Sequence, residues 1–90
     1  MTTEKLSLGC TVITPGALAR VTETEATCAL RRHAAGDWGD LHPDDRALNQ
    51  RSVAEGGRVF SEYRTTKGQK FWIITEADRS VTTILLPSEY

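Results

Sequence analysis

The longest apolar runs of the chain lie in its last third, at 71–75 (FWIIT) and 81–86 (VTTILL). Both runs consist largely of β-branched and aromatic residues, which favour strands. Alternate positions of 71–75 are apolar on both faces, so we expect a central strand that is covered on both sides. The connection at 77–80 predicts a hairpin turn in which Asp78 bonds the backbone two residues further on, and Pro87 is expected to end the second strand.

A third strand is predicted at 58–65, joined to the first run by a glycine-containing turn at 66–68. These segments should form an antiparallel meander with 69–76 as its middle strand. Residues 6–13 also alternate with a period of two, ending at Thr14, which predicts a strand that could join the sheet as a fourth, edge strand. We therefore expect an antiparallel sheet of three or four strands.

A short helix is predicted to begin at Thr14-Pro15, because threonine is a good N-cap and proline suits the first helical position. Ala17, Leu18 and Val21 would then lie on one side of this helix.

Two further helices are predicted before the meander. Thr22 or Thr24 would cap a second helix that runs to about Ala35, with Gly36 as its C-terminal stop. A third helix would span 43–54, with a thin apolar stripe and therefore a place on the surface. The chain is thus predicted to be α+β, with short helices in its N-terminal half packed on an antiparallel sheet.

Composition limits the possible functions. The chain has 90 residues, which we expect to form a single domain over 1–90. Its 11 basic and 12 acidic residues are interspersed and give a net charge of −1, without the basic stripe typical of nucleic-acid binders. No signal peptide and no apolar run long enough to span a bilayer is recognised. Cys10 and Cys28 are expected to be small buried residues in a reducing compartment.

The segment from Arg32 to His42 holds the candidate catalytic residues. In a functional interpretation, His33 shuttles a proton and Asp37 or Asp40 orients it, with His42 nearby. In a structural interpretation, which we favour, the segment is a helix stop. Its tryptophan then fills the core and its first aspartate bonds the local backbone.

Candidate binding residues lie in two loops, and we list them as Trp38, Asp40, Glu76, Asp78 and Arg79. The last three form the tip of the predicted hairpin, where a rigid sheet could present them to a partner. The alternative is a solvated turn with an ion pair between an acidic residue and the arginine.

Basic and aromatic residues on the meander leave nucleic-acid binding open as a minority interpretation; they are Tyr63, Arg64, Lys67, Lys70 and Trp72. We expect neither a metal nor another cofactor, because the spacing of Cys28, His33, Asp37 and His42 matches no standard zinc pattern.

Three blocks, 13–18 (ITPGAL), 32–41 (RHAAGDWGDL) and 72–83 (WIITEADRSVTT), support a family resemblance. The chain resembles a family of short proteins of bacterial plasmids, integrative elements and prophages. They are usually labelled only as plasmid-related proteins, and some carry what looks like a mistaken restriction-enzyme subunit label. The resemblance implies a mobile element and a bacterial cytoplasm, and it assigns no catalytic residue.

Three functional hypotheses follow. The first is a non-enzymatic protein that binds another protein, either a second copy or a component of host defence, as an inhibitor of the anti-CRISPR or anti-restriction type. Its basis is the sheet with two apolar faces, one of which could be left for a partner. The second is a small nuclease or toxin-like RNase that uses His33, Asp37 and His42. The third is a nucleic-acid-binding module.

Overall fold

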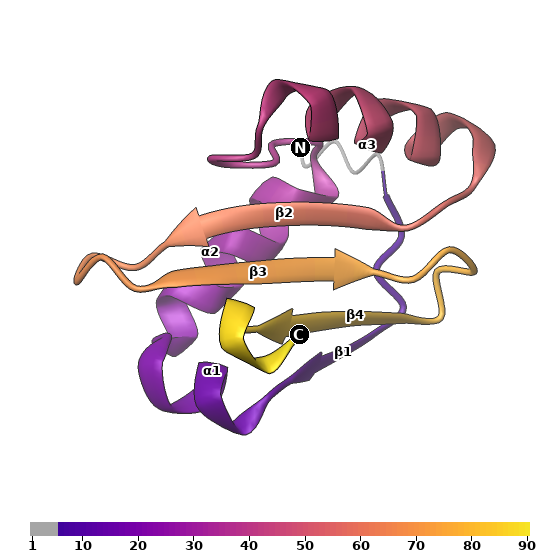
Figure 1. The fold of residues 1–90 in the computed structure, drawn as a ribbon. Helices are drawn as coiled ribbons and strands as arrows, with labels where there is room; N and C mark the ends of the chain where they lie inside the picture. Colours follow the sequence, from indigo (N-terminus) through magenta and orange to yellow (C-terminus); the bar gives the residue numbers. More distant parts are fainter. Residues whose placement is uncertain (1–5) are drawn as a thin grey trace.

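The computed structural model describes residues 6–90, and it shows the predicted α+β class (Figure 1). A four-stranded sheet is accompanied by three helices and a final 3-10 turn. The elements in chain order are β1 (Cys10–Ile13), α1 (Pro15–Arg20), α2 (Glu23–Ala34), α3 (Pro43–Glu55), β2 (Val59–Arg64), β3 (Lys70–Thr75), β4 (Val81–Leu85) and η1 (Pro87–Glu89). Within these residues, none of the helices has the length and apolar character needed to cross a bilayer.

The strand order is β1-β4-β3-β2, and β2, β3 and β4 form the predicted antiparallel meander. β1 is the expected fourth, edge strand, and it pairs in parallel with β4, so the sheet is antiparallel in its three-stranded meander and parallel at this edge. Three helices separate β1 from the meander, and a crossover of this length allows a parallel neighbour that a short hairpin could not.

β1 is also shorter than the predicted segment 6–13. The chain turns at Gly9, which has a φ of +64° and lies against the carbonyl oxygens of Arg79 and Ser80. A side chain at this position would collide with that backbone, so the regular pairing starts only at Cys10.

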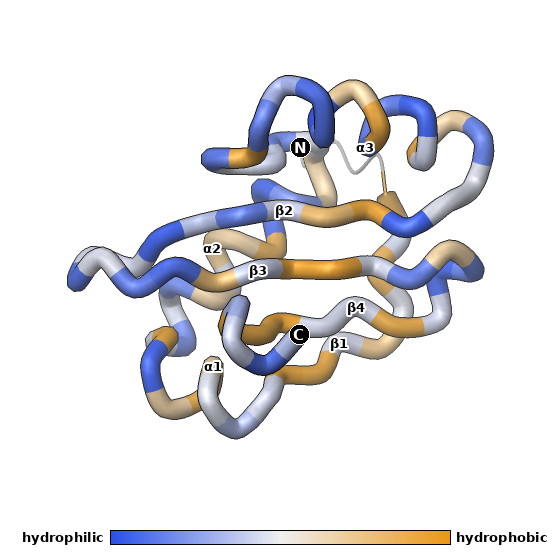
Figure 2. Tube along the Cα trace, viewed as in Figure 1, coloured by the Kyte–Doolittle hydropathy of each residue, from blue (hydrophilic) through white to orange (hydrophobic). Residues whose placement is uncertain are grey.

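Helices α1 and α2 cover one face of the sheet, whereas η1 lies on the other (Figure 1). Figure 2 shows that the hydrophobic middle of β3 lies in the centre of the sheet. The main core cluster lies between the sheet and these two helices, and it contains Ala17, Val21, Ala29, Tyr63, Phe71, Ile73, Ile84 and Leu86. Ile74, on the opposite face of β3, is also buried, as expected for a central strand.

The free edge of β2 is closed by other parts of the chain. The side-chain amide of Asn49, on α3, donates to the carbonyl of Phe60 and accepts from its N–H at 3.1 Å. The N–H of Asp40 donates to the carbonyl of Glu62 at 2.8 Å, and the N–H of Glu62 donates to the carbonyl of Trp38 at 3.2 Å. Every outward-facing backbone group at Phe60 and Glu62 is thus satisfied, which removes a template for strand pairing at this edge.

The helix boundaries follow the local signals. Thr14 caps α1, and Thr22 rather than Thr24 caps α2 through a reciprocal capping box with Glu25. α2 ends at Ala34, and Gly36 follows it with a φ of +87°.

The two cysteines lie elsewhere than predicted. Cys10 and Cys28 are both exposed free thiols, not buried ones. On α1 only Ala17 is buried, and Leu18 is 67% exposed. Cys28 lies one turn before Arg32 on the outer side of α2, and Cys10 lies at the start of the edge strand.

Candidate functional site

His33 is at the centre of a buried chain of hydrogen bonds. Its Nδ1 contacts the hydroxyl of Ser61, and its Nε2 lies 2.9 Å from the hydroxyl of Thr75. Thr75 continues to Thr82 at 2.8 Å, and Thr82 donates to the carbonyl of Leu8 at 2.7 Å. This chain of hydrogen bonds therefore joins α2, all three strands of the meander and the segment before β1.

The last acceptor fixes the direction of every proton in this chain. A carbonyl can only accept, so the single hydroxyl proton of Thr82 is committed to Leu8. Thr75 must then donate to Thr82 and accept from Nε2–H of His33. The neutral ring consequently accepts at Nδ1 from the hydroxyl of Ser61.

Burial lowers the pKa of His33 from 6.5 to about 4, and the positive charge of Arg79 adds to this effect. A second proton would sit on Nδ1, where Ser61 already donates, so the hydrogen-bond pattern also favours the neutral ring. His33 is therefore uncharged near neutral pH.

Ser61 and His33 have the chemistry of a nucleophile with its base, a pairing that the sequence analysis missed. The only available signal was the inward position of Ser61 in the alternating strand β2. Both residues have 0% exposed surface, so a substrate in solvent does not reach the serine hydroxyl. The pair is a polar part of the core in which the hydroxyl and both ring nitrogens have hydrogen-bond partners.

Asp37 and Trp38 have the places that the structural interpretation predicted. Arg32 donates two hydrogen bonds to the carboxylate of Asp37, at 2.8 and 3.2 Å, and the same carboxylate accepts from the N–H of Gly39. The hydrogen bond from Arg32 is the main reason why the pKa of Asp37 lies below its usual value. Trp38 is 5% exposed, and its ring meets that of His33 edge-on at 5.7 Å.

The structure does not bring His42 or Asp40 to His33. His42 is exposed at the start of α3, where its Nδ1 accepts from the N–H of Asp44. The carboxylate of Asp40 lies 3.7 Å from Arg64. Over residues 6–90 there is no group of three or more His, Cys, Asp or Glu side chains arranged to hold a metal ion.

The tip of the hairpin between β3 and β4 is held to the rest of the protein. The guanidinium of Arg79 donates to the backbone carbonyls of Ser52, Gly57 and Glu76, and its φ is +62°. Asp78 accepts from the N–H of Ser80 at 3.0 Å, as predicted.

The ion pair expected at this tip is not seen among the described residues, in which Glu76 pairs with Arg58 at 3.3 Å. The reason is that the guanidinium of Arg79 is occupied by backbone carbonyls. Of the three candidate binding residues at the tip, Asp78 is the most exposed and Arg79 is a structural brace.

The aromatic residues of the meander lie on two different faces. Trp72 packs against Phe60 and Tyr90 on the face that carries η1, and its Nε1 donates to Glu62 at 3.0 Å. Tyr63 is buried on the helix-covered face, with the guanidinium of Arg32 4.9 Å from its ring centre. These aromatic rings therefore do not form one stacking platform with the basic residues.

A largely apolar hollow lies where β1 meets the junction of α1 and α2. This groove, which we call the β1 groove, has a volume of about 460 Å³. Val12, 43% exposed, and Leu18, 67% exposed, both line it. Its residues are Thr11, Val12, Ile13, Leu18, Val21, Thr22, Glu23, Ala26, Thr27 and Ile84.

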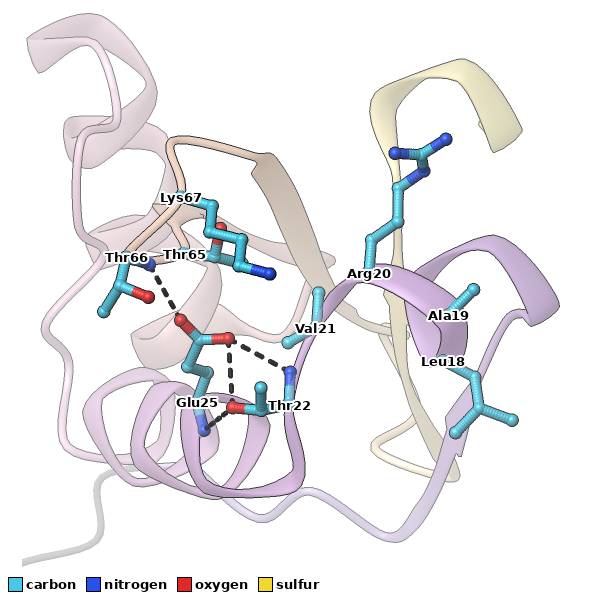
Figure 3. A pocket seen from close by; sticks show the side chains of 9 residues that line it. All are labelled: Leu18, Ala19, Arg20, Val21, Thr22, Glu25, Thr65, Thr66 and Lys67. Atoms are coloured by element: carbon cyan, nitrogen blue, oxygen red, sulfur yellow. Dashed lines mark hydrogen bonds between the residues drawn. The ribbon is translucent and has the colours of Figure 1, made fainter.

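A second, more polar hollow of about 270 Å³ lies on the other side of the same junction (Figure 3). Glu25 is fixed there by Thr22 and by the N–H of Thr66, which ties α2 to the turn between β2 and β3. In Figure 3 the side chain of Leu18 points away from Glu25 and Lys67. The α1–α2 junction is therefore held rigidly between the two hollows.

Comparisons with models of protein families, with curated proteins and with solved structures found no match for this chain. The resemblance to plasmid-borne proteins stays a prediction from the sequence.

Proposed function

We propose that this protein is a non-enzymatic accessory protein that acts by binding another protein at the β1 groove. The observation that carries the proposal is the pair of large apolar side chains, Val12 and Leu18, that remain exposed on one apolar hollow. Contiguous exposed apolar surface of this kind marks interaction sites on small soluble domains. A component of host defence is the partner that the resemblance implies, with a second copy of the chain as the other option.

The energetics favour a partner at this site. Full burial of an exposed valine or leucine side chain is worth about 1.5–3 kcal/mol, and a partner would gain the part of this that the 43% exposed Val12 and the 67% exposed Leu18 still offer. The α1–α2 junction, held by the bonds of Glu25, loses little entropy on binding. The other large exposed apolar residues within 6–90 are Leu48 and Tyr90. Leu48 stands alone on α3, and Tyr90 already packs on Trp72, so neither offers a comparable groove.

No observation raises the other two hypotheses to the same level. The candidate nuclease residues are divided between the core at His33, a surface ion pair at Asp37 and a helix start at His42. The basic residues proposed for nucleic-acid binding include Arg64 and Lys70, which lie near Asp40 and Glu62.

The test is an affinity pull-down of the tagged protein from a bacterial host lysate treated with nuclease, read by mass spectrometry. We expect one stoichiometric protein partner with the wild type. Leu18→Lys should abolish its capture, because it removes apolar surface from the groove and places a charge where apolar side chains of the partner would be buried.

Leu48→Lys is the matched control, since it makes the same change at a residue that is 56% exposed on α3. Both variants should unfold like the wild type. A partner that binds all three proteins equally, or a bait without any partner or self-association, would contradict the proposal.

A further inference from the structure

The two edge strands, β1 and β2, differ in whether their outward-facing backbone groups have hydrogen-bond partners. At β2, Asn49 and the loop at 38–40 occupy the outward-facing backbone groups. At β1 the N–H of Cys10 donates to Ser80 and that of Thr14 donates to Ile84, so the even-numbered residues face β4. Because backbone groups alternate along a strand, those of Thr11 and Ile13 point to the other side.

The outward groups of Thr11 and Ile13 have no hydrogen-bond partner among the described residues. β1 is a short edge strand of four residues, but Cys10–Ile13 contains neither a charged residue nor a proline that would hinder pairing with another strand. The same residues line the β1 groove, so an unpaired edge and an apolar hollow lie side by side.

We propose that the β1 groove binds an extended, largely apolar segment of the partner protein, which adds to the sheet as a fifth strand beside β1. This inference rests on the proposed protein-binding function and specifies its mode. Thr11 and Ile13 supply the backbone donors and acceptors, and the groove receives alternate side chains of the segment.

The size of the site favours a short segment over a folded surface. Ten residues line the groove, whereas a stable interface between two folded partners uses about 20–30 residues on each side. The four residues of β1 give a pairing length of about 13 Å. A second copy of the chain would need more contact area than this edge offers.

The charge of the groove adds a second requirement. Among residues 6–90, Glu23 is the only charged residue that lines it, and it lies in the first turn of α2 next to Thr22. A lysine or arginine near one end of the segment would meet this carboxylate, while the groove-facing positions between would be apolar. The partner segment is therefore extended, apolar at alternate positions and basic near one end.

The test uses random dodecapeptides displayed on phage and selected against the full-length protein. We expect the enriched peptides to show this pattern of alternate apolar residues with one basic residue. With the best peptide, made synthetically, Thr11→Pro should weaken binding about tenfold, because it removes an outward N–H that β4 does not use. Thr11→Val is the control; it keeps the N–H and should bind within about twofold of the wild type.

Amide exchange measured by NMR on the wild type gives a readout that does not depend on any variant. The amides of Thr11 and Ile13 should become protected when the peptide is bound. No enriched pattern, equal binding by Thr11→Pro, or unprotected amides in the complex would each overturn the strand-addition mode. So would a dimer in sedimentation that Thr11→Pro dissociates, since a second copy would then occupy the edge.

The host partner separates this inference from the function on which it rests. Capture that is lost with Leu18→Lys but kept with Thr11→Pro would leave the binding surface correct and the strand mode wrong. Capture that neither change affects would contradict both the proposed binding surface and the strand-addition mode.

Discussion

At the scale of single residues, His33 makes the stability of the protein depend on pH. Its pKa is lowered to about 4 by burial, so the unfolded chain takes up a proton before the folded one as the pH falls. Stability is fully present above about pH 6.5 and is lost as the pH falls toward 4, by about 3 kcal/mol in all. His33→Gln should flatten the curve between pH 6.5 and 5, as measured by urea unfolding.

The control for this prediction is His42→Asn, which keeps a capping oxygen at the start of α3 and leaves the buried ring in place. It should retain the steep dependence of the wild type. Carboxylates such as Asp37, whose pKa is lowered by Arg32, add their own loss at more acidic pH, so the upper window is the decisive one. An unchanged slope in His33→Gln would contradict the assignment.

The residues of the candidate site differ in how well the sequence anticipates them. Asp37, Trp38 and Asp78 act through the local backbone or through helix periodicity, and their structural roles could be predicted. The roles of Ser61 and Arg79 could not be predicted, because their partners are distant in the sequence. Ser61 contacts His33, 28 residues away, and Arg79 bonds Gly57 and Ser52, 22 or more residues away. Such contacts form only once the strands and helices have packed together.

At the scale of elements, α3 depends on one amide. It buries only Asn49, which pairs with both backbone groups of Phe60. Asn49→Leu should destabilise the protein by about 2 kcal/mol, because it leaves a donor and an acceptor of the strand without partners. Chemical unfolding measures this loss, and amide exchange should quicken at Phe60 more than at Glu62, which has its own bond to Trp38.

Gln50→Leu is the matched control, as it replaces an exposed amide by leucine at the next position of the same helix. It should change stability by less than about 0.5 kcal/mol. Equal effects of the two changes would show that the edge of β2 does not need the side chain of Asn49.

Elements with local signals were predicted well, and their arrangement less so. The starts of α1 and α2 follow from threonine caps, and the meander follows from turns of a few residues. The direction of β1 relative to β4 depends on a crossover of three helices, and no local pattern encodes it. The β1 groove therefore could not be predicted from the sequence either, because it exists only where β1 meets the α1–α2 junction.

At the scale of the whole molecule, Arg79 joins three parts of the chain through hydrogen bonds to backbone carbonyls. Its guanidinium connects the β3–β4 hairpin with the end of α3 and with the segment before β2. Arg79→Ala should lower the free energy of unfolding by about 2 kcal/mol and the Tm by about 10 °C. The alanine variant loses the hydrogen bonds of the guanidinium, which form the brace, and keeps a strained backbone with a φ of +62°.

Arg79→Gly separates these two effects, because glycine adopts a positive φ without strain. It should be more stable than Arg79→Ala by about 1 kcal/mol while still falling below the wild type. The β1 groove shares no residue with this brace, so both variants should bind the partner normally well below their Tm. If strain alone governed this corner of the fold, Arg79→Ala would be as stable as the wild type and Arg79→Gly would be more stable than it, and that result would contradict the brace. Loss of partner binding at low temperature would show that the two ends of the sheet are coupled.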